Sequence, residues 1–129
     1  MPSAKIHKEQ ATHNYTFLKS ISNDFRDWKL IVAFYTVLQL IDSELTAKNA
    51  RWRDGSQGNM YEWRDRIISN YFREIYTSYG VLFQRSKEAR YLEGLGEKKA
   101  VDYLTAQIVD DCLEKHFKKI IEFFSFSQQ

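Results

Sequence analysis

The stretch DWKLIVAFYTVLQLIDSELTAK, residues 27–48, decides the fold. Within residues 30–41 only Thr36 and Gln39 are polar, and no Gly or Pro occurs between residues 23 and 50. A helix that is apolar almost all round belongs in the middle of a bundle. The many β-branched and aromatic residues also suit a strand, but the uninterrupted length is far more than a strand needs. Charges close to both ends make the apolar run too short for a bilayer, so we expect no membrane contact.

Apolar patterns on both sides of this stretch predict an all-α, up-down bundle of four long helices and one short helix in a single domain, residues 1–129. The long helices are expected at residues 4–21, 27–48, 71–90 and 97–124, the short one at about 59–70, and a loop at 49–58. A break is expected near Ser69 and Asn70, whose side chains compete for backbone hydrogen bonds. Gly80 inside a helix suggests a close approach to another helix, because it costs about 1 kcal/mol against alanine.

The chemistry-bearing residues outside the arginines are few. One cysteine, Cys112, excludes an internal disulfide, and His7, His13 and His116 make no metal-ligand spacing with it. We therefore expect neither a metal nor a cofactor. The first ten residues lack the apolar core of a signal peptide, so we expect a cytoplasmic protein.

The positive charge of the chain is concentrated in its middle. Residues 51–90 hold eight Lys or Arg against five acids, and seven of the eight are arginine, whereas residues 91–129 hold five bases against seven acids. The planar fork of arginine suits phosphate and carboxylate recognition. The alternative is a solvated helix face with ion pairs one turn apart.

Two segments resemble a known family. Asp27-Trp28, followed by Ala33-Phe34-Tyr35 and Asp42, resembles the central helix of small HEPN-like proteins (higher eukaryotes and prokaryotes nucleotide-binding). The segment YTSYGVLFQRSKEARY, residues 76–91, is similar to the helix of these proteins that ends in Ser and Ala-Arg-Tyr. The resemblance implies a helical bundle that often pairs as a dimer.

In ribonuclease members, the resemblance also implies an arginine followed after four to six residues by a histidine, and this chain lacks that motif. Where relatives of this small group place histidine three residues before an arginine, it has Tyr61 before Arg64. A tyrosine, with a pKa of about 10, cannot replace histidine as a base near neutrality.

The sequence and the resemblance together predict a HEPN-like nucleotide- or RNA-binding module without catalysis, in a defence or toxin–antitoxin setting. The candidate phosphate-binding residues are Arg64, Arg66, Arg90, Tyr61, Tyr91 and Tyr35. Structural roles compete: Tyr35 suits a core position, and Arg90 and Tyr91 suit a helix end. Two alternatives stay open, a metal-independent endoribonuclease with a rearranged site, and an interaction bundle whose partner is another protein such as a nucleotidyltransferase.

The aromatic inventory predicts a two-fold homodimer. Outside the central helix the chain carries Trp52, Trp63, Tyr71, Phe72, Phe123, Phe124 and Phe126. We expect that a monomer of this size struggles to bury all of them, and large exposed apolar patches usually mark partner surfaces. Two-fold pairing is the commonest closed arrangement.

Overall fold

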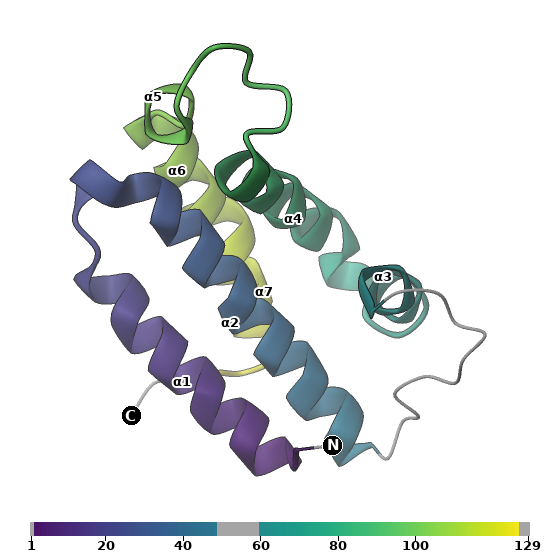
Figure 1. Ribbon diagram of the computed structural model, residues 1–129. Helices are drawn as coiled ribbons and strands as arrows, with labels where there is room; N and C mark the ends of the chain where they lie inside the picture. The colour runs from purple at the N-terminus through teal and green to yellow at the C-terminus, as the bar shows by residue number, and fades with distance from the viewer. Residues whose placement is uncertain (1, 49–59, 127–129) are drawn as a thin grey trace.

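The computed structural model describes residues 2–48 and 60–126, and this part of the chain is all-helical, as predicted (Figure 1). The α-helices are α1 Ala4–Ser20, α2 Arg26–Ala47, α3 Met60–Tyr71, α4 Tyr76–Tyr91, α5 Ala100–Tyr103, α6 Ala106–Cys112 and α7 Lys118–Phe123. Short 3₁₀ turns, η1 Asn23–Phe25 and η2 Arg73–Ile75, lead into α2 and α4, and a π-helical segment, η3 Leu113–Phe117, joins α6 to α7. No strand occurs among the described residues.

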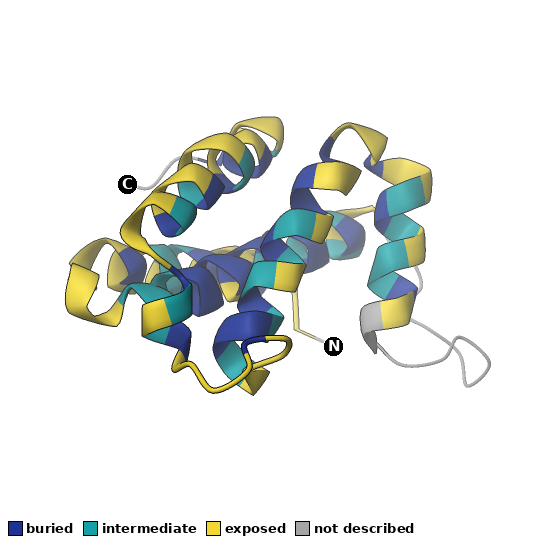
Figure 2. Ribbon diagram, turned by 90° about the horizontal axis from the view of Figure 1, so that it is seen from above, coloured by how far each residue is buried: buried dark blue, intermediate teal, exposed yellow. Residues whose placement is uncertain are grey.

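The central position of α2 is confirmed. Twelve of its 22 residues are buried, and it packs against α1 on one side and α4 on the other (Figures 1 and 2). The buried hydroxyl of Thr36 donates to the Val32 carbonyl at 2.8 Å. It therefore avoids the cost of an unsatisfied buried donor.

Length and composition alone would allow residues Asn23–Ala47 to cross a membrane, but 67% of the apolar window is buried inside the bundle. The core helix of a soluble protein has this property. The apolar character of α2 is thus accounted for by its protein neighbours.

The break between α3 and α4 was expected near Ser69 and Asn70, and the structure places it slightly later, at Phe72. This residue leaves the helical region, with φ −129° and ψ 47°. Its ring is buried and meets the rings of Phe123 and Phe124 edge to face, with centroids 6.0 and 5.5 Å apart. Aromatic packing against the C-terminal helix therefore accompanies the turn, which a local propensity argument does not anticipate.

The single long helix expected over residues 97–124 is not observed. The chain instead forms α5, then breaks at Leu104, and the Thr105 hydroxyl caps α6 by accepting from the Ile108 amide at 3.3 Å. Arg26 of α2 stabilises the break, because its Nε donates to the Leu104 carbonyl at 2.7 Å. The expectation of four long helices is accordingly not confirmed.

The close approach expected at Gly80 is wrong. Gly80 is exposed on α4, and a Cβ built there would meet nothing within 4 Å. Its backbone is helical, so no conformational requirement for glycine is visible either.

Several aromatics that motivated the dimer are buried within one chain. Trp63, Phe72 and Phe126 are buried, whereas Tyr71 is 71% exposed and Phe123 is 36% exposed. Trp52 lies outside the described residues. A single copy therefore covers more of this inventory than we expected.

Candidate functional site

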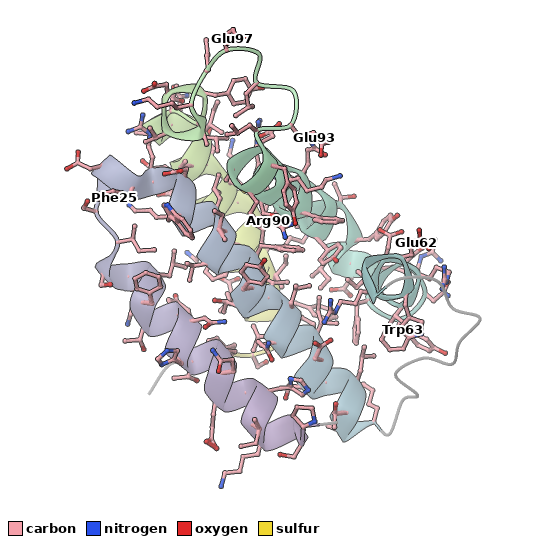
Figure 3. All side chains as sticks on the ribbon, in the orientation of Figure 1. Phe25, Glu62, Trp63, Arg90, Glu93 and Glu97 are labelled. Carbon is pink, nitrogen blue, oxygen red and sulfur yellow. The ribbon has the colours of Figure 1, made fainter. Side chains whose placement is uncertain are left out.

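The clearest convergence of candidate residues surrounds Arg90, near the end of α4. Its Nη1 donates to the hydroxyls of Tyr35 and Tyr91, each at 3.2 Å. Its Nη2 lies 3.2 Å from the Ser86 hydroxyl, and its Nε donates to the Ser86 carbonyl at 3.4 Å. Figure 3 shows Arg90 between α4 and α2. Contacts from two helices thus fix the plane of this guanidinium.

Aromatic rings enclose the same guanidinium. Its Cζ lies 5.4 Å from the ring centroid of Phe34, 5.5 Å from that of Tyr35 and 4.8 Å from that of Tyr91. These distances suit cation–π attraction, which acts within about 6 Å. Phe34 is fully buried and forms the floor, whereas Tyr35 is 39% exposed and Tyr91 is 63% exposed. We call Tyr35, Arg90 and Tyr91 the Arg90 surface.

Arg90 and Tyr91 lie at the C-terminal end of α4. Leu92 adopts a left-handed conformation, with φ 56°, and its amide donates to the Glu88 carbonyl, which ends the helix. Arg90 and Tyr91 therefore occupy the last turn. A cation in that turn complements the negative end of the helix dipole.

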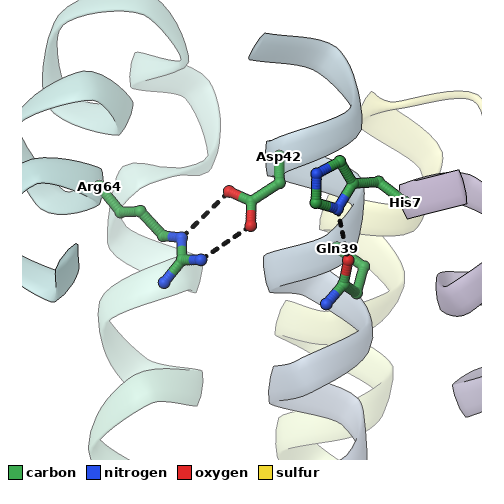
Figure 4. Close-up of polar contacts among 4 residues, drawn as sticks. All are labelled: His7, Gln39, Asp42 and Arg64. Carbon is green, nitrogen blue, oxygen red and sulfur yellow. Dashed lines mark hydrogen bonds and ion pairs between the residues drawn. The ribbon is translucent and has the colours of Figure 1, made fainter. Parts of the chain in front are cut away.

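Arg64 has a different position. Its Nη2 and Nε donate to the two carboxylate oxygens of Asp42 at 2.7 and 3.1 Å (Figure 4). The side chains are only 11% and 3% exposed, respectively. Burial raises the pKa of Asp42, while the Arg64 hydrogen bond and charge, and to a lesser extent His7, oppose that rise. The pair connects α3 to α2.

A second buried polar contact adjoins this pair. The Nδ1 of His7 lies 2.7 Å from the Oε1 of Gln39, so the imidazole donates to the amide oxygen (Figure 4). His7 is buried on α1, and this contact connects α1 to α2. Both bonds involve the few polar positions of α2.

Arg90 and Arg64 contact α2 at two different positions along its axis, at Tyr35 and at Asp42. Tyr35 and Asp42 are seven residues apart, which is close to two helical turns, or about 10 Å along the axis. Arg66 is exposed on α3, and the side chain of Tyr61 lies outside the described residues. Of the six candidate residues, the structure therefore brings together Tyr35, Arg90 and Tyr91, and directs Arg64 to Asp42.

Ser86, which orients Arg90, is the serine of the Ser and Ala-Arg-Tyr helix end, but it was not among the six candidates, and the contact between His7 and Gln39 was not predicted. The sequence did hold a signal that Gln39 lies near the site. Tyr35 and Gln39 are one turn apart on a helix that is otherwise almost wholly apolar, and residues with this spacing share a face.

A hydrogen-bonded pair, Ser78 and His116, and the thiol of Cys112 lie away from the Arg90 surface. The Ser78 hydroxyl is 3.0 Å from Nδ1 of His116, and burial, with Lys115 and Lys119, lowers the pKa of His116. Burial raises the pKa of Cys112 to about 11. Among residues 2–48 and 60–126, no group of three or more His, Cys, Asp or Glu is arranged to hold a metal ion.

The Arg90 surface offers a fixed cation, two phenolic hydroxyls and exposed ring faces in one place. That combination suits a ligand with an anionic group and a planar ring. Comparison with protein-family models, with curated proteins and with solved structures gives no match.

Proposed function

We propose that this protein binds the phosphate groups of a nucleotide or of RNA at the Arg90 surface. The observation that carries the proposal is the shared position of the Tyr35 and Tyr91 hydroxyls, each 3.2 Å from the same nitrogen of Arg90. The two hydroxyls can be no farther apart than twice that distance. They and the guanidinium edge therefore lie within the reach of one phosphate group.

Hydrogen bonding makes these hydroxyls better donors toward an anion. Each accepts from Arg90, and a phenol that accepts one bond still has its own O–H to donate. The oxygens that contact Arg90 in these bonds are hydroxyls and a carbonyl, so the bonds orient the guanidinium. Charge-assisted bonds of arginine to phosphate are among the stronger ones in proteins.

We favour binding over cleavage because of where the histidines lie. His7 donates to Gln39 inside the bundle, and His116 contacts Ser78. Neither contact involves Arg90; His7 lines a groove beside Tyr35, but its Nδ1 is bonded to Gln39. Ribonuclease activity with a rearranged site stays the alternative, and incubation of varied RNAs with the purified protein tests it: cleavage that is lost in Arg90→Gln would support an enzyme.

The wider setting follows from the resemblance to HEPN-like proteins. We propose a HEPN-like bundle in the cytoplasm, acting in defence or in a toxin–antitoxin pair, with a protein such as a nucleotidyltransferase as a further partner. The support is the helical order and the Ala-Arg-Tyr end of α4, which supplies two residues of the Arg90 surface.

We also propose a two-fold homodimer, through an aromatic face where α1 leads into α2. Phe17, Phe25 and Trp28 are 53%, 61% and 51% exposed there and line a hollow of about 600 Å³. Figure 3 shows Phe25 at this corner. Asp24 and Lys29 are sequence neighbours of Phe25 and Trp28, so this segment carries both signs of charge and can meet its own copy without net repulsion.

Measurement of RNA and nucleotide binding at low ionic strength tests the proposal, because phosphate contacts weaken steeply with salt. We expect Arg90→Gln to weaken binding about tenfold or more. Arg90→Lys should restore only part of the affinity, because lysine lacks the planar guanidinium that contacts both tyrosines through Nη1 and Ser86 through Nη2 and Nε. The matched control is Arg73→Gln, which removes an exposed arginine from η2. Equal affinities of the Arg90→Gln and Arg73→Gln variants would contradict the proposal.

A further inference from the structure

A second feature adjoins the Arg90 surface on the opposite side of Tyr35. A groove of about 480 Å³ runs between α1 and α2, and Tyr35 forms part of its wall. Its lining also includes Ile6, His7, Gln10, Asn14 and Gln39. Its volume lies within the range of small-molecule sites, about 300–1,000 Å³.

The groove is lined by amides and carries no charged Lys, Arg, Asp or Glu side chain among its lining residues. The Nε2 of Gln10 donates to the Oδ1 of Asn14 at 2.9 Å. That bond leaves the Gln10 oxygen as an acceptor and the Asn14 nitrogen as a donor, on two side chains of the same groove wall. Deeper in, Gln39 accepts from His7 through its oxygen, so its amide nitrogen is the part directed to other partners.

Amide donors and acceptors that line one groove can pair with the donors and acceptors of a nucleobase edge. Proteins read unpaired bases by hydrogen bonds to such edges and by stacking on aromatic side chains. Tyr35 supplies an exposed aromatic ring at the boundary between the groove and the Arg90 surface. The absence of charge in the lining makes the groove a poor site for a second phosphate.

We propose that the groove between α1 and α2 receives the base of the nucleotide whose phosphate is held at the Arg90 surface. This inference rests on the proposed function. The ligand would cross α2 at Tyr35, whose hydroxyl faces Arg90 and whose ring borders the amides. The ligand class is then a nucleotide or single-stranded RNA with an unpaired base, since a base within a duplex cannot offer its pairing edge.

The test compares the four nucleoside 5′-monophosphates with ribose 5-phosphate, titrated into the full chain at one low salt concentration. We expect at least one nucleotide to bind about tenfold or more tighter than ribose 5-phosphate, from stacking and edge contacts. The variant Gln10→Ala/Asn14→Ala should reduce that advantage to about threefold or less. Both substitutions introduce the best helix former on α1, where Gln10 is exposed and Asn14 is half-buried. Gln84→Ala, an exposed glutamine of α4, is the matched control and should leave the advantage unchanged.

The outcomes separate this inference from the proposed function. If nucleotides and ribose 5-phosphate bind equally, and Arg90→Gln weakens both, the phosphate site stands and the base groove is wrong. If a nucleotide advantage survives Gln10→Ala/Asn14→Ala unchanged, the base lies elsewhere and the inference is again wrong. If none of these phosphates binds the folded protein, both proposals fail together.

Discussion

Arg64 of α3 meets both carboxylate oxygens of Asp42 on α2, at 2.7 and 3.1 Å, in a setting where both side chains are nearly excluded from water. The two residues are 22 positions apart in the chain. A buried ion pair of this kind is weak evidence of net stabilisation, but breaking it by removing one partner leaves an uncompensated buried charge.

Replacing Arg64 with methionine should therefore destabilise the protein by about 3–5 kcal/mol. Methionine keeps much of the side-chain volume but leaves the Asp42 carboxylate buried without its cation. Urea denaturation followed by circular dichroism measures the loss. The double variant Asp42→Leu/Arg64→Met should recover a large part of it, because no buried charge remains, and failure to recover would show that packing rather than charge is responsible.

The cost of Arg64→Met should also depend on pH. The pKa of Asp42 is already raised by burial, and loss of Arg64 removes what opposes the rise. The folded variant then binds this proton more strongly than the unfolded chain, so its unfolding free energy increases as the pH falls through the folded-state pKa of Asp42 toward 3.8. Urea melts from neutral pH down to about pH 4.5 should show the gap to the wild type narrowing. A constant gap would contradict this account.

Gly80→Ala should stabilise the protein by about 0.5–1 kcal/mol. Gly80 lies inside α4 with open space where the new methyl would be, so alanine lowers the entropy of the unfolded chain without a clash. The control is Gly94→Ala, which should destabilise instead, because φ at Gly94 is +78°. Thermal denaturation of the two variants should move the midpoint in opposite directions.

Cys112 should resist thiol reagents in the folded protein. It is 3% exposed, and burial raises its pKa from 9.0 to about 11, so its thiolate fraction at pH 8 falls about a hundredfold and its rate of alkylation falls at least as much. Iodoacetamide labelling followed by mass spectrometry, with and without urea, measures the ratio. Rapid labelling of the native protein would mean that this part of the bundle opens readily.

The proposed homodimer predicts a solution mass of twice 15.4 kDa. Light scattering at micromolar concentration should detect it, and Phe25→Ser/Trp28→Ser should shift the mass toward one chain by removing two exposed rings of the aromatic face. Ile6→Ser removes an equally exposed apolar side chain from the other end of α1 and should have no effect. A mass of one chain that is unchanged on concentrating contradicts the dimer.

The sequence predicted those features that depend on neighbours along the chain. The long apolar run without Gly or Pro places α2 at the centre. The polar exceptions in it, Thr36 and Gln39, engage in hydrogen bonds, as does Asp42 directly after it. Spacing within one helix says which residues share a face. It does not say which distant residue meets that face.

For that reason Arg64 and Arg90 looked alike in the sequence and differ in the structure. Both are arginines on helices other than α2 that reach it through their side chains, but Arg64 falls opposite a carboxylate and Arg90 opposite a phenol. The break at Leu104 escaped prediction for the same reason, since Arg26, which bonds its carbonyl, lies 78 positions away.

The π-helical segment Leu113–Phe117 has a consequence for how this chain tolerates change in length. Buried Cys112 and buried Phe117 are five residues apart, a spacing that the wider π turn keeps on one side. A chain lacking Glu114 would have the same two side chains four residues apart, which is the spacing of a regular α-helix on one face. A single-residue deletion within a helix normally rotates everything after it by about 100°. Here it would exchange one kind of turn for another, and the core beyond Phe117 would keep its register.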